Sequence, residues 1–200
     1  MKIRIQPMGE YQTNCYIVTI DGKDIIIDPG VDASKWVIEN ITNPIAILNT
    51  HGHFDHVWSN AELQAQLKIP LYTPEDDVML LTSSSWMPDL PLSIPEYKVK
   101  PDEEINIDGI KLKFHHFPGH TPGCSMIEIG DAIFSGDFIF EHSIGRYDFP
   151  YSNPQDMIKS LQKFKKLNYD KTLYPGHGNT TTIKQEQHFS DYWIANIKTS

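Results

Sequence analysis

Histidine and aspartate side chains gather between residues 51 and 56 in a pattern suited to metal binding. Four potential ligands fall within these six consecutive residues, namely His51, His53, Asp55 and His56. Imidazole and carboxylate ligands without a thiolate favour zinc, iron or manganese at a catalytic site over a closed structural zinc site. The cluster follows residues 45–49, a largely apolar run typical of a buried strand, so we expect the ligands on the loop that leaves that strand.

Three further polar residues each follow a strand-like segment and stand beside glycine. They are His120 after Gly119, Asp137 after Gly136 and His177 after Gly176. Glycine lets the backbone turn sharply and approach other segments closely, so this recurrence suits a site assembled from distant parts of the sequence. Together with the cluster they make seven candidate ligands, enough for two metal ions that share one carboxylate and leave room for a bridging water.

The other histidines lack this setting, and we interpret them as ordinary strand or surface residues. They are His115, His116, His142 and His188. A lone histidine on a loop is more often solvated or capping than bound to metal, so His120 and His177 gain their weight from the cluster.

Composition and charge restrict the class of protein. Two hundred residues with 40% hydrophobic content suffice for one well-packed domain, which we expect to span residues 1–200. The net charge of −9, or −9 + 4 = −5 with two divalent ions, has the wrong sign for binding a nucleic acid backbone. The N-terminus alternates charged and apolar residues instead of resembling a signal peptide, and no apolar run is long enough to cross a bilayer. We therefore expect a soluble cytoplasmic protein that binds neither nucleic acid nor membrane, with Cys15 and Cys124 as buried free thiols.

The spacing of apolar residues predicts alternating strands and helices. A hairpin is expected at residues 14–20 and 23–28, joined by the Asp21-Gly22 turn. Further strands are expected at residues 45–49, 110–117, 124–129, 131–135 and 171–174, and helices at 33–41, 56–68, 154–166 and 182–197. Short strands with helices interspersed in both halves predict an α/β fold in which two packed sheets lie under helical cover, a four-layer αββα sandwich.

Residues 83–95 have a different character, because turn formers alternate with large apolar groups such as Trp86. Two interpretations stay open for this segment. It is either a lid over the site or a surface loop whose tryptophan packs onto the body of the protein, since loops of this length are often functional or simply irregular.

These motifs make the chain resemble the metallo-β-lactamase fold superfamily, and within it the short glyoxalase II-like hydrolases. The resemblance covers the whole chain and is carried by the His-x-His-x-Asp-His motif at residues 51–56, followed by a single His, Asp and His in that order. It implies a first metal ion held by His51, His53 and His120, a second held by Asp55, His56 and His177, and Asp137 bridging both. It also implies that Asp28, in an Asp-Pro-Gly turn, supports the site from behind the ligands.

The activity that the resemblance implies is thioester hydrolysis. Two divalent ions, zinc by first choice with iron or manganese as alternatives, would convert a bridging water into a hydroxide that attacks a glutathione-derived thioester such as S-lactoylglutathione. Asp55 would orient that water and accept its proton. Gly145-Arg146 stands at a spacing similar to the step that binds the glutathione carboxylate in glyoxalase II enzymes, with Tyr147 as its companion. An ion pair between Arg146 and Asp148 is the alternative interpretation.

Other functions of the same fold stay open. The sequence is expected to lack the C-terminal helical domain of long glyoxalase II enzymes, which weakens the case for glutathione specificity. Persulfide dioxygenases share nearly all these ligands but use a single iron, and hydrolysis of another ester or a lactone is a further alternative. A β-lactamase is disfavoured by the missing export signal, nucleic acid processing by the lack of room for an inserted domain, and a module without catalysis by the complete ligand set.

Overall fold

The N-terminal half of the chain builds a mixed sheet in the order β1-β2-β3-β4-β5-β6. In the computed structural model, which describes residues 1–199, its strands are β1 (Lys2–Met8), β2 (Thr13–Ile20), β3 (Lys23–Ile27), β4 (Pro44–Leu48), β5 (Leu71–Pro74) and β6 (Tyr97–Val99). The expected Asp21-Gly22 turn joins β2 and β3 as an antiparallel hairpin. From β3 onward the strands run parallel, so their C-terminal ends meet at one edge of the sheet.

The C-terminal half builds a second sheet in the order β14-β13-β10-β9-β8-β7. Its strands are β7 (Glu104–Ile107), β8 (Ile110–His116), β9 (Ser125–Ile129), β10 (Ala132–Gly136), β13 (Thr172–Pro175) and β14 (Thr181–Thr182), and a small hairpin follows β10 with β11 (Ile139–Phe140) and β12 (Ser143–Ile144). Strands β10 and β13 pair in parallel, and β9 runs antiparallel between β8 and β10. The turns after β8, β10 and β13 therefore leave the sheet at the same edge.

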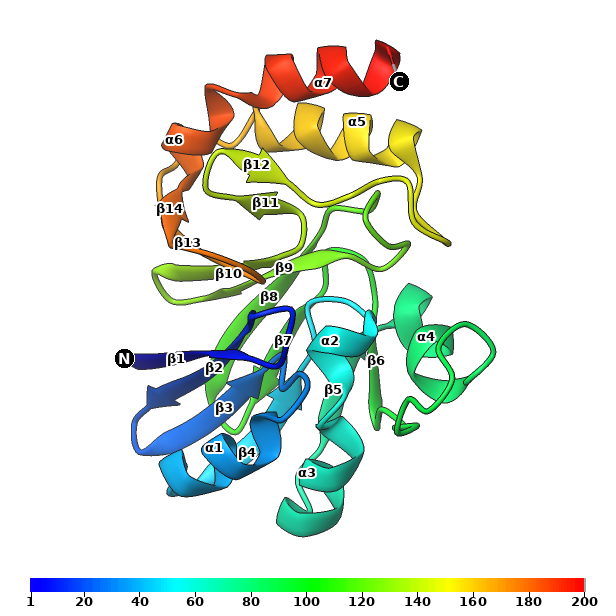
Figure 1. Cartoon of the computed structure of the whole chain (residues 1–200). Coiled ribbons are helices and arrows are strands. Elements are labelled where there is room, and N and C mark those ends of the chain that lie inside the picture. Colours follow the sequence, from blue (N-terminus) through cyan, green and yellow to red (C-terminus); the bar gives the residue numbers. More distant parts are fainter. Residues whose placement is uncertain (200) are drawn as a thin grey trace.

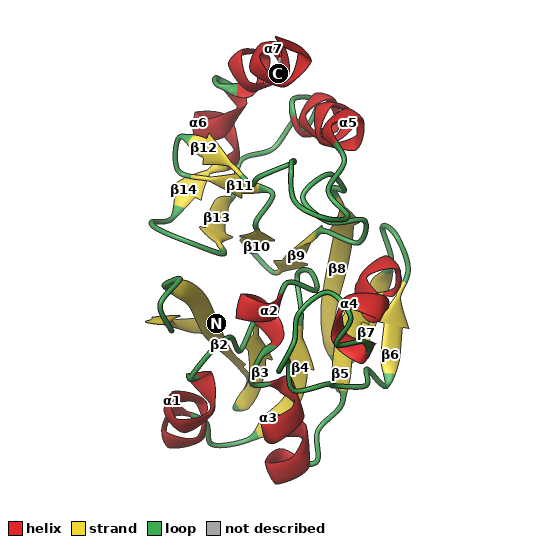
Figure 2. Ribbon diagram, turned by 45° about the vertical axis from the view of Figure 1, so that its right-hand side comes forward, coloured by secondary structure: helices red, strands yellow, loops and turns green. Residues whose placement is uncertain are grey.

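Helices cover the outer face of each sheet, which gives four layers (Figures 1 and 2). Below the first sheet in Figure 1 lie α1 (Ala33–Asn40) and α3 (Asn60–Leu67), and above the second lie α5 (Pro154–Phe164) and α7 (Ser190–Thr199). One apolar cluster, with Tyr16 and Phe134, fills the space between the sheets. A second, with Phe164, lies under α5 and α7, and a third, with Val37 and Leu63, lies against α1 and α3. The predicted α/β sandwich is confirmed.

The helix predicted at residues 56–68 is interrupted. It consists of α2 (Phe54–Val57) and α3, with Ser59 between them. The Ser59 N–H donates to the Pro29 carbonyl at 3.0 Å and its hydroxyl to the Gly30 carbonyl at 2.6 Å. These bonds fasten the short helix α2 to the Asp-Pro-Gly turn, and helical periodicity alone does not reveal them.

The closing helix predicted at residues 182–197 is interrupted as well. Its parts are α6 (Ile183–Gln187) and α7. Glu186 in α6 is buried and accepts hydrogen bonds from the Thr181 hydroxyl and the His142 N–H. This carboxylate ties α6 to the turn between β11 and β12, so the chain changes direction before α7 begins.

The segment at residues 83–95 follows α4 (Val78–Thr82) and contains neither helix nor strand, although all of it is described. The indole N–H of Trp86 donates to the Leu80 carbonyl at 2.7 Å, and Trp86 and Met87 pack against the third apolar cluster. The tryptophan is therefore fastened to the body of the protein.

Two expectations concern the whole chain. Within residues 1–199, no helix combines the length and the apolar character needed to cross a bilayer. The expectation of one domain over residues 1–200 stays a prediction, and Ser200 lies outside the described residues.

Asp24, at the start of β3, is a buried carboxylate that fastens the outer end of the first sheet. It accepts hydrogen bonds from the Thr19 hydroxyl, from the N–H groups of Thr42 and Asn43 at 2.7 and 3.0 Å, and from Arg4 at 3.3 Å. Burial opposes its ionisation, yet these bonds hold its pKa below the ordinary value of 3.8. The ionised form therefore contributes to stability.

Asp24→Asn should lower the free energy of unfolding at neutral pH by about 1–3 kcal/mol, because its amide group would face buried donors. The folded-state pKa of the carboxyl lies below its unfolded value, so its contribution is present above about pH 4 and is lost as the pH falls through the folded pKa. Urea unfolding of both proteins at neutral pH and near pH 3 should give the smaller difference at low pH. Equal differences at the two pH values would contradict this assignment.

Candidate metal centre

Four segments that are distant in the sequence converge where strands of both sheets end. The loop after β4 and helix α2 supply the motif at residues 51–56, and the turns after β8, β10 and β13 supply His120, Asp137 and His177. All of these side chains are buried except that of His177, which is partly exposed. The structure thus brings all seven predicted ligands together.

Asp137 occupies the centre of this group. Its Oδ1 lies 3.2 Å from Nε2 of His56, and its Oδ2 lies 3.5 Å from Nε2 of His120 and 3.4 Å from Nε2 of His177. Asp55 stands beside it, with Oδ2 3.3 Å from Nε2 of His177. One carboxylate therefore touches histidines from both halves of the site.

The potential ligand atoms fall into two sets. Nδ1 of His53 and Nε2 of His120 lie 2.8 Å apart, and with His51 they form a set whose ligand atoms are all within 4.8 Å of one another. The ligand atoms of a second set also lie within 4.8 Å of one another, and this set consists of Asp55, His56 and His177. These are the two groups that the resemblance implies, with Asp137 in contact with both.

Unpaired buried atoms indicate that this arrangement fits metal ions. His51 Nε2, His56 Nε2 and Asp137 Oδ1 are buried and have no hydrogen-bond partner among the described residues. The atoms His56 Nε2 and Asp137 Oδ1 lie 3.2 Å apart, but their geometry is not that of a hydrogen bond. Each buried polar atom without a partner costs about 1–3 kcal/mol, and cations placed among them would satisfy all three.

Close packing at glycine lets the ligand-bearing turns meet. A Cβ at Gly176 would lie 2.0 Å from Oδ1 of Asp137 and 2.7 Å from the His56 ring, so a side chain there would displace the ligands. Gly136 has φ +50°, and its Cβ would lie 2.5 Å from the Thr50 hydroxyl. The glycines that flank the predicted ligands are thus required by the contact between the turns.

Hydrogen bonds at the opposite ring nitrogens orient four of the histidines. Each Nδ1 contacts an oxygen: His51 that of the Thr50 hydroxyl at 3.1 Å, His56 that of Asp28 at 3.0 Å, His120 the Arg146 carbonyl at 2.7 Å, and His177 the Tyr11 carbonyl at 3.0 Å. Carbonyl oxygens only accept, so Nδ1 of His120 and of His177 carries a proton, and in the neutral form of each ring Nε2 presents a lone pair to the site. The backbone itself selects the metal-binding tautomer.

Asp28 supports the second ligand set from behind. Its Oδ2 accepts from the Thr50 hydroxyl at 2.6 Å and contacts Nδ1 of His56, while its Oδ1 accepts from the Thr50 N–H at 2.8 Å. Asp28 also lies within 4.8 Å of ligand atoms of His51 and His56. Because both of its oxygens are already engaged, we assign it the supporting role that the sequence predicts.

The charges of the site favour ionised carboxylates. Burial opposes ionisation of Asp55, but His56 and hydrogen bonds from His177 and Thr13 lower its pKa to about 2. Burial likewise opposes protonation of His177, but its contacts with Asp137 and Asp55 raise its pKa to about 9. Burial and the neighbouring His120 ring lower the pKa of His53 to about 3. In the absence of metal, the histidines of the second set, His56 and His177, therefore carry additional protons where the cation would lie.

Asp77 is a residue of the site that the sequence analysis missed. It lies in the short turn after β5 (Glu75–Asp77) and is completely buried. Its carboxylate accepts from the Gly52 N–H at 2.8 Å, the Thr121 hydroxyl at 2.6 Å and the Gly123 N–H at 2.6 Å. Burial raises its pKa to about 6 despite these donors. Asp77 thus joins the loop of His51 and His53 to the loop of His120.

The predicted substrate contacts, Arg146 and Tyr147, lie near the site, but the side chain of Arg146 is exposed and that of Tyr147 packs against the protein. The guanidinium of Arg146 is exposed, pairs with Asp148 at 2.7 and 2.9 Å, and lies 4.1 Å from the centre of the Phe149 ring. Tyr147 is partly buried against the second apolar cluster. Both residues line a groove of about 430 Å³ beside α7, which also includes Trp193. The ion pair with Asp148 is therefore present in the structure.

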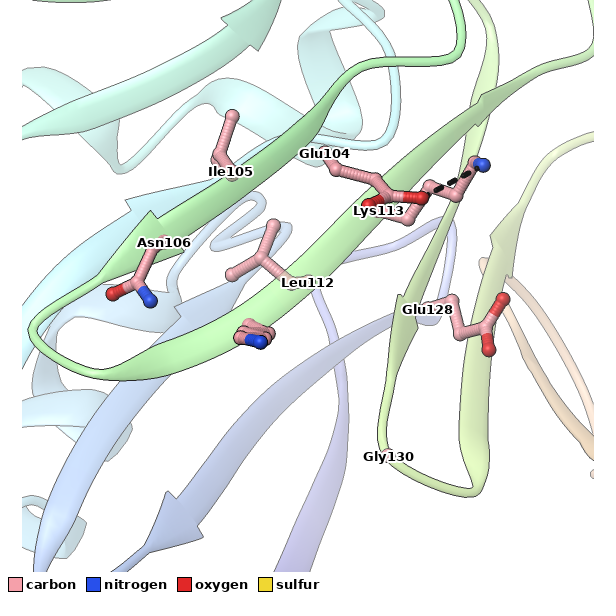
Figure 3. A pocket seen from close by; sticks show the side chains of 8 residues that line it. Glu104, Ile105, Asn106, Leu112, Lys113, Glu128 and Gly130 are labelled. Carbon is pink, nitrogen blue, oxygen red and sulfur yellow. Dashed lines mark hydrogen bonds and ion pairs between the residues drawn. The ribbon is translucent and has the colours of Figure 1, made fainter.

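A second groove lies away from this chemistry (Figure 3). It has a volume of about 520 Å³ and is lined by residues of β7, β8 and β9, including Lys113, which pairs with Glu104 at 3.1 Å. None of the seven predicted ligands lines it. Its charged groups lie on an exposed sheet surface, and we assign it no role in the site.

Asp77→Asn should weaken one of two metal-binding steps by about 10–100-fold, because the amide cannot accept from all the donors that hold the two loops of the first ligand set. The step that involves the second set should keep its affinity. Titration of the metal-free protein with Zn²⁺ in competition with a chelating indicator measures both steps.

Asp24→Asn is the matched control, because Asp24 is also a buried carboxylate with a hydroxyl and two backbone N–H donors. It should lower stability without changing either metal affinity. If Asp77→Asn bound both ions as tightly as the unmodified protein, Asp77 would have only a general structural role.

Comparison with known proteins agrees with this architecture. The family model for the metallo-beta-lactamase superfamily matches residues 8–177. Hydroxyacylglutathione hydrolase GloC of Haemophilus influenzae is 35% identical over 202 residues, which cover 94% of this chain and 95% of that protein. Among solved structures, BLEG-1 B3 metallo-beta-lactamase has a TM-score of 0.85 at 29% identity, with 96% of this chain and 99% of that chain covered. TTHA1623 in a di-iron-bound form has a TM-score of 0.78 at 32% identity, with 92% and 96% covered. The chain belongs to the metallo-beta-lactamase superfamily.

Proposed function

We propose that this protein hydrolyses thioesters of the S-lactoylglutathione kind. The observation that carries the proposal is the position of Asp137, whose carboxylate contacts histidines of both ligand sets with Asp55 beside it. A shared carboxylate between two sets of ligands suits hydrolysis at a pair of metal ions. The likeness to the hydroxyacylglutathione hydrolase GloC supports a thioester as the substrate.

Two divalent ions are the proposed cofactors, with zinc as first choice and iron or manganese as alternatives. His51, His53 and His120 would hold one ion, Asp55, His56 and His177 the other, and Asp137 both. Once bound, the ions would lower the pKa of a shared water to about 7 and polarise the substrate carbonyl. The related protein with two irons supports a binuclear site but leaves the choice of metal to experiment.

The residues of the site have distinct parts in the proposed reaction. Asp55 remains ionised at neutral pH, and the Thr13 hydroxyl donates to its Oδ2 at 2.7 Å, which fixes the carboxylate in place. Asp55 would orient the attacking water and accept its proton. The thiol product leaves as a thiolate, because a thiol pKa of about 8.5 makes prior protonation unnecessary. No protein nucleophile is required.

Arg146 is the proposed partner of a carboxylate on the thiol portion of the substrate. A guanidinium offers about five N–H donors, and the two bonds to Asp148 engage only two of them. The backbone carbonyl of Arg146 orients His120, and its guanidinium lies over the Phe149 ring, whose centre is 6.0 Å from that of His53. We keep Tyr147 as an additional contact in the groove that both residues line.

Zinc-loaded protein should hydrolyse S-lactoylglutathione, and a chelator should abolish the activity. Asp55→Ala should lower kcat/KM at least about 100-fold, because it removes a ligand and the group that orients the water. Loss of thioester absorbance measures the rate, and elemental analysis of the same samples gives the metal content. An unchanged rate in the variant would refute the role given to Asp55.

The same measurements separate the alternatives. An ester and a lactone belong in the substrate panel, together with oxygen uptake in the presence of glutathione persulfide. One iron per chain with oxygen uptake and no thioester hydrolysis would replace the proposal by a persulfide dioxygenase. Faster turnover of the ester or lactone than of every thioester would identify a different hydrolase.

Arg146→Gln should raise KM for S-lactoylglutathione about tenfold with kcat within about twofold, because it removes a contact made before and during the reaction. The substitution keeps the backbone carbonyl that orients His120. Lys165→Gln, which removes an exposed cation paired with Asp191, is the control and should change neither constant. An unchanged KM in Arg146→Gln would show that Arg146 does not bind the substrate and only forms its ion pair with Asp148.

A further inference from the structure

Aromatic side chains from separate segments form a continuous surface beside the metal centre. Ring centres of Tyr11 and Phe54 lie 5.2 Å apart, those of Phe54 and Trp86 6.5 Å, those of Trp86 and His53 5.9 Å, and those of His53 and Phe149 6.0 Å. We call Tyr11, Phe54, Trp86 and Phe149 the aromatic wall. Two of its members flank a predicted metal ligand directly.

The aromatic wall is fixed by contacts with the body of the protein. Trp86 is held by its bond to the Leu80 carbonyl, and Phe54 and Trp86 both pack against the third apolar cluster. The Tyr11 carbonyl accepts from His177 at 3.0 Å, so its backbone belongs to the site. The contacts of Trp86 and Phe54 hold these two rings against the body of the protein, which favours a binding surface over a mobile lid.

Part of the wall is left uncovered by the chain. Tyr11 is 60% exposed and Phe149 is 39% exposed, although the Phe149 ring lies beside the rings of the buried ligands His53 and His120. Hydrolysis of the carbonyl uses none of these rings. Apolar surface next to a few polar groups is typical of a small-molecule site, where it binds an apolar part of the ligand.

The two sides of His53 differ in charge. On one side the guanidinium of Arg146 covers Phe149 at 4.1 Å, and in the proposed function this cation binds the carboxylate of the thiol portion. On the other side the Trp86 ring lies 5.9 Å from the His53 ring, with Phe54 next to Trp86. The acyl and thiol portions of a thioester diverge from the carbonyl carbon, so the side of Trp86 and Phe54 is available to the acyl portion.

We propose that Trp86 and Phe54 bind an apolar substituent of aryl size on the acyl group, which makes aryl-substituted 2-hydroxyacyl thioesters better substrates than the lactoyl thioester. This inference rests on the proposed thioester hydrolysis and specifies its substrate class. S-Mandeloylglutathione and S-lactoylglutathione form the matched pair of probes, because they share the thiol and the 2-hydroxyl group and differ only in phenyl against methyl.

The experiment compares kcat/KM for the two thioesters. The unmodified protein should favour the mandeloyl thioester at least about tenfold, since an apolar pocket discriminates by about 10–200-fold for even one added methylene. Trp86→Leu should reduce this preference to about threefold or less, because kcat/KM for the mandeloyl thioester should fall further than kcat/KM for the lactoyl thioester. Phe54→Leu should have the same effect on the preference, and it provides the test if Trp86→Leu fails to fold.

Trp36→Leu is the control, because Trp36 lies on α1 and packs against the same apolar cluster without lining the site. It should leave the preference unchanged. A preference for the lactoyl thioester, or a mandeloyl preference that both site variants retain, would overturn the inference while leaving thioester hydrolysis intact. Failure of both probes with metal-loaded protein would instead refute the proposed function.

Discussion

The fold turns the acceptor atoms of buried imidazoles and carboxylates toward one another. Asp137 is almost completely buried, and burial alone would oppose its ionisation, yet the His56 and His177 rings around it hold its pKa well below the ordinary range. His51 Nε2 and His56 Nε2 have no hydrogen-bond partner in the described part of the chain. Such a group is unfavourable unless protons or cations lie among its members. The convergence of chain segments that forms the sandwich therefore also builds a site that either protons or metal ions must occupy.

The two sheets contribute different parts of the candidate metal centre. The first sheet supplies the motif at residues 51–56 and two buried carboxylates that hold its surroundings. Asp28, after β3, engages Thr50 and His56, and Asp77, after β5, engages Gly52 together with the loop that follows His120. The second sheet supplies single ligands on turns that pack closely at glycine. Asp77 thus supports the first ligand set, whereas Asp28 supports His56 of the second set directly and His51 of the first through Thr50.

The features that the sequence reveals are those carried by local patterns. The Asp21-Gly22 turn, the apolar strands and the four-layer arrangement follow from periodicity, and the ligands stand out because each single one follows glycine at a strand end. Strands β5, β6 and β7 are only three or four residues long, which is too short for a period to be recognised.

Contacts between distant segments account for what the sequence does not reveal. Ser59 interrupts a helix through bonds to Pro29 and Gly30, and Asp77 is one of three consecutive acidic residues in an ordinary turn. Its importance appears only when the loops of His51 and His120 meet over its carboxylate. The aromatic wall is hidden for the same reason, since Phe54 and Trp86 come together only in the folded chain.

A shared fold does not decide the substrate of an enzyme. A hydroxyacylglutathione hydrolase and a B3 metallo-beta-lactamase are both similar to this chain over nearly its whole length, although their names indicate different substrates. The side chains around the site are therefore expected to contribute to discrimination between such substrates. In this protein those side chains lie on the loop that follows α4 and on the loop that follows β12, where Trp86 and Arg146 flank the centre. If the proposed thioester hydrolysis holds, substitutions in these loops would change the preferred acyl or thiol group while leaving the buried carboxylates, and with them the metal site, in place.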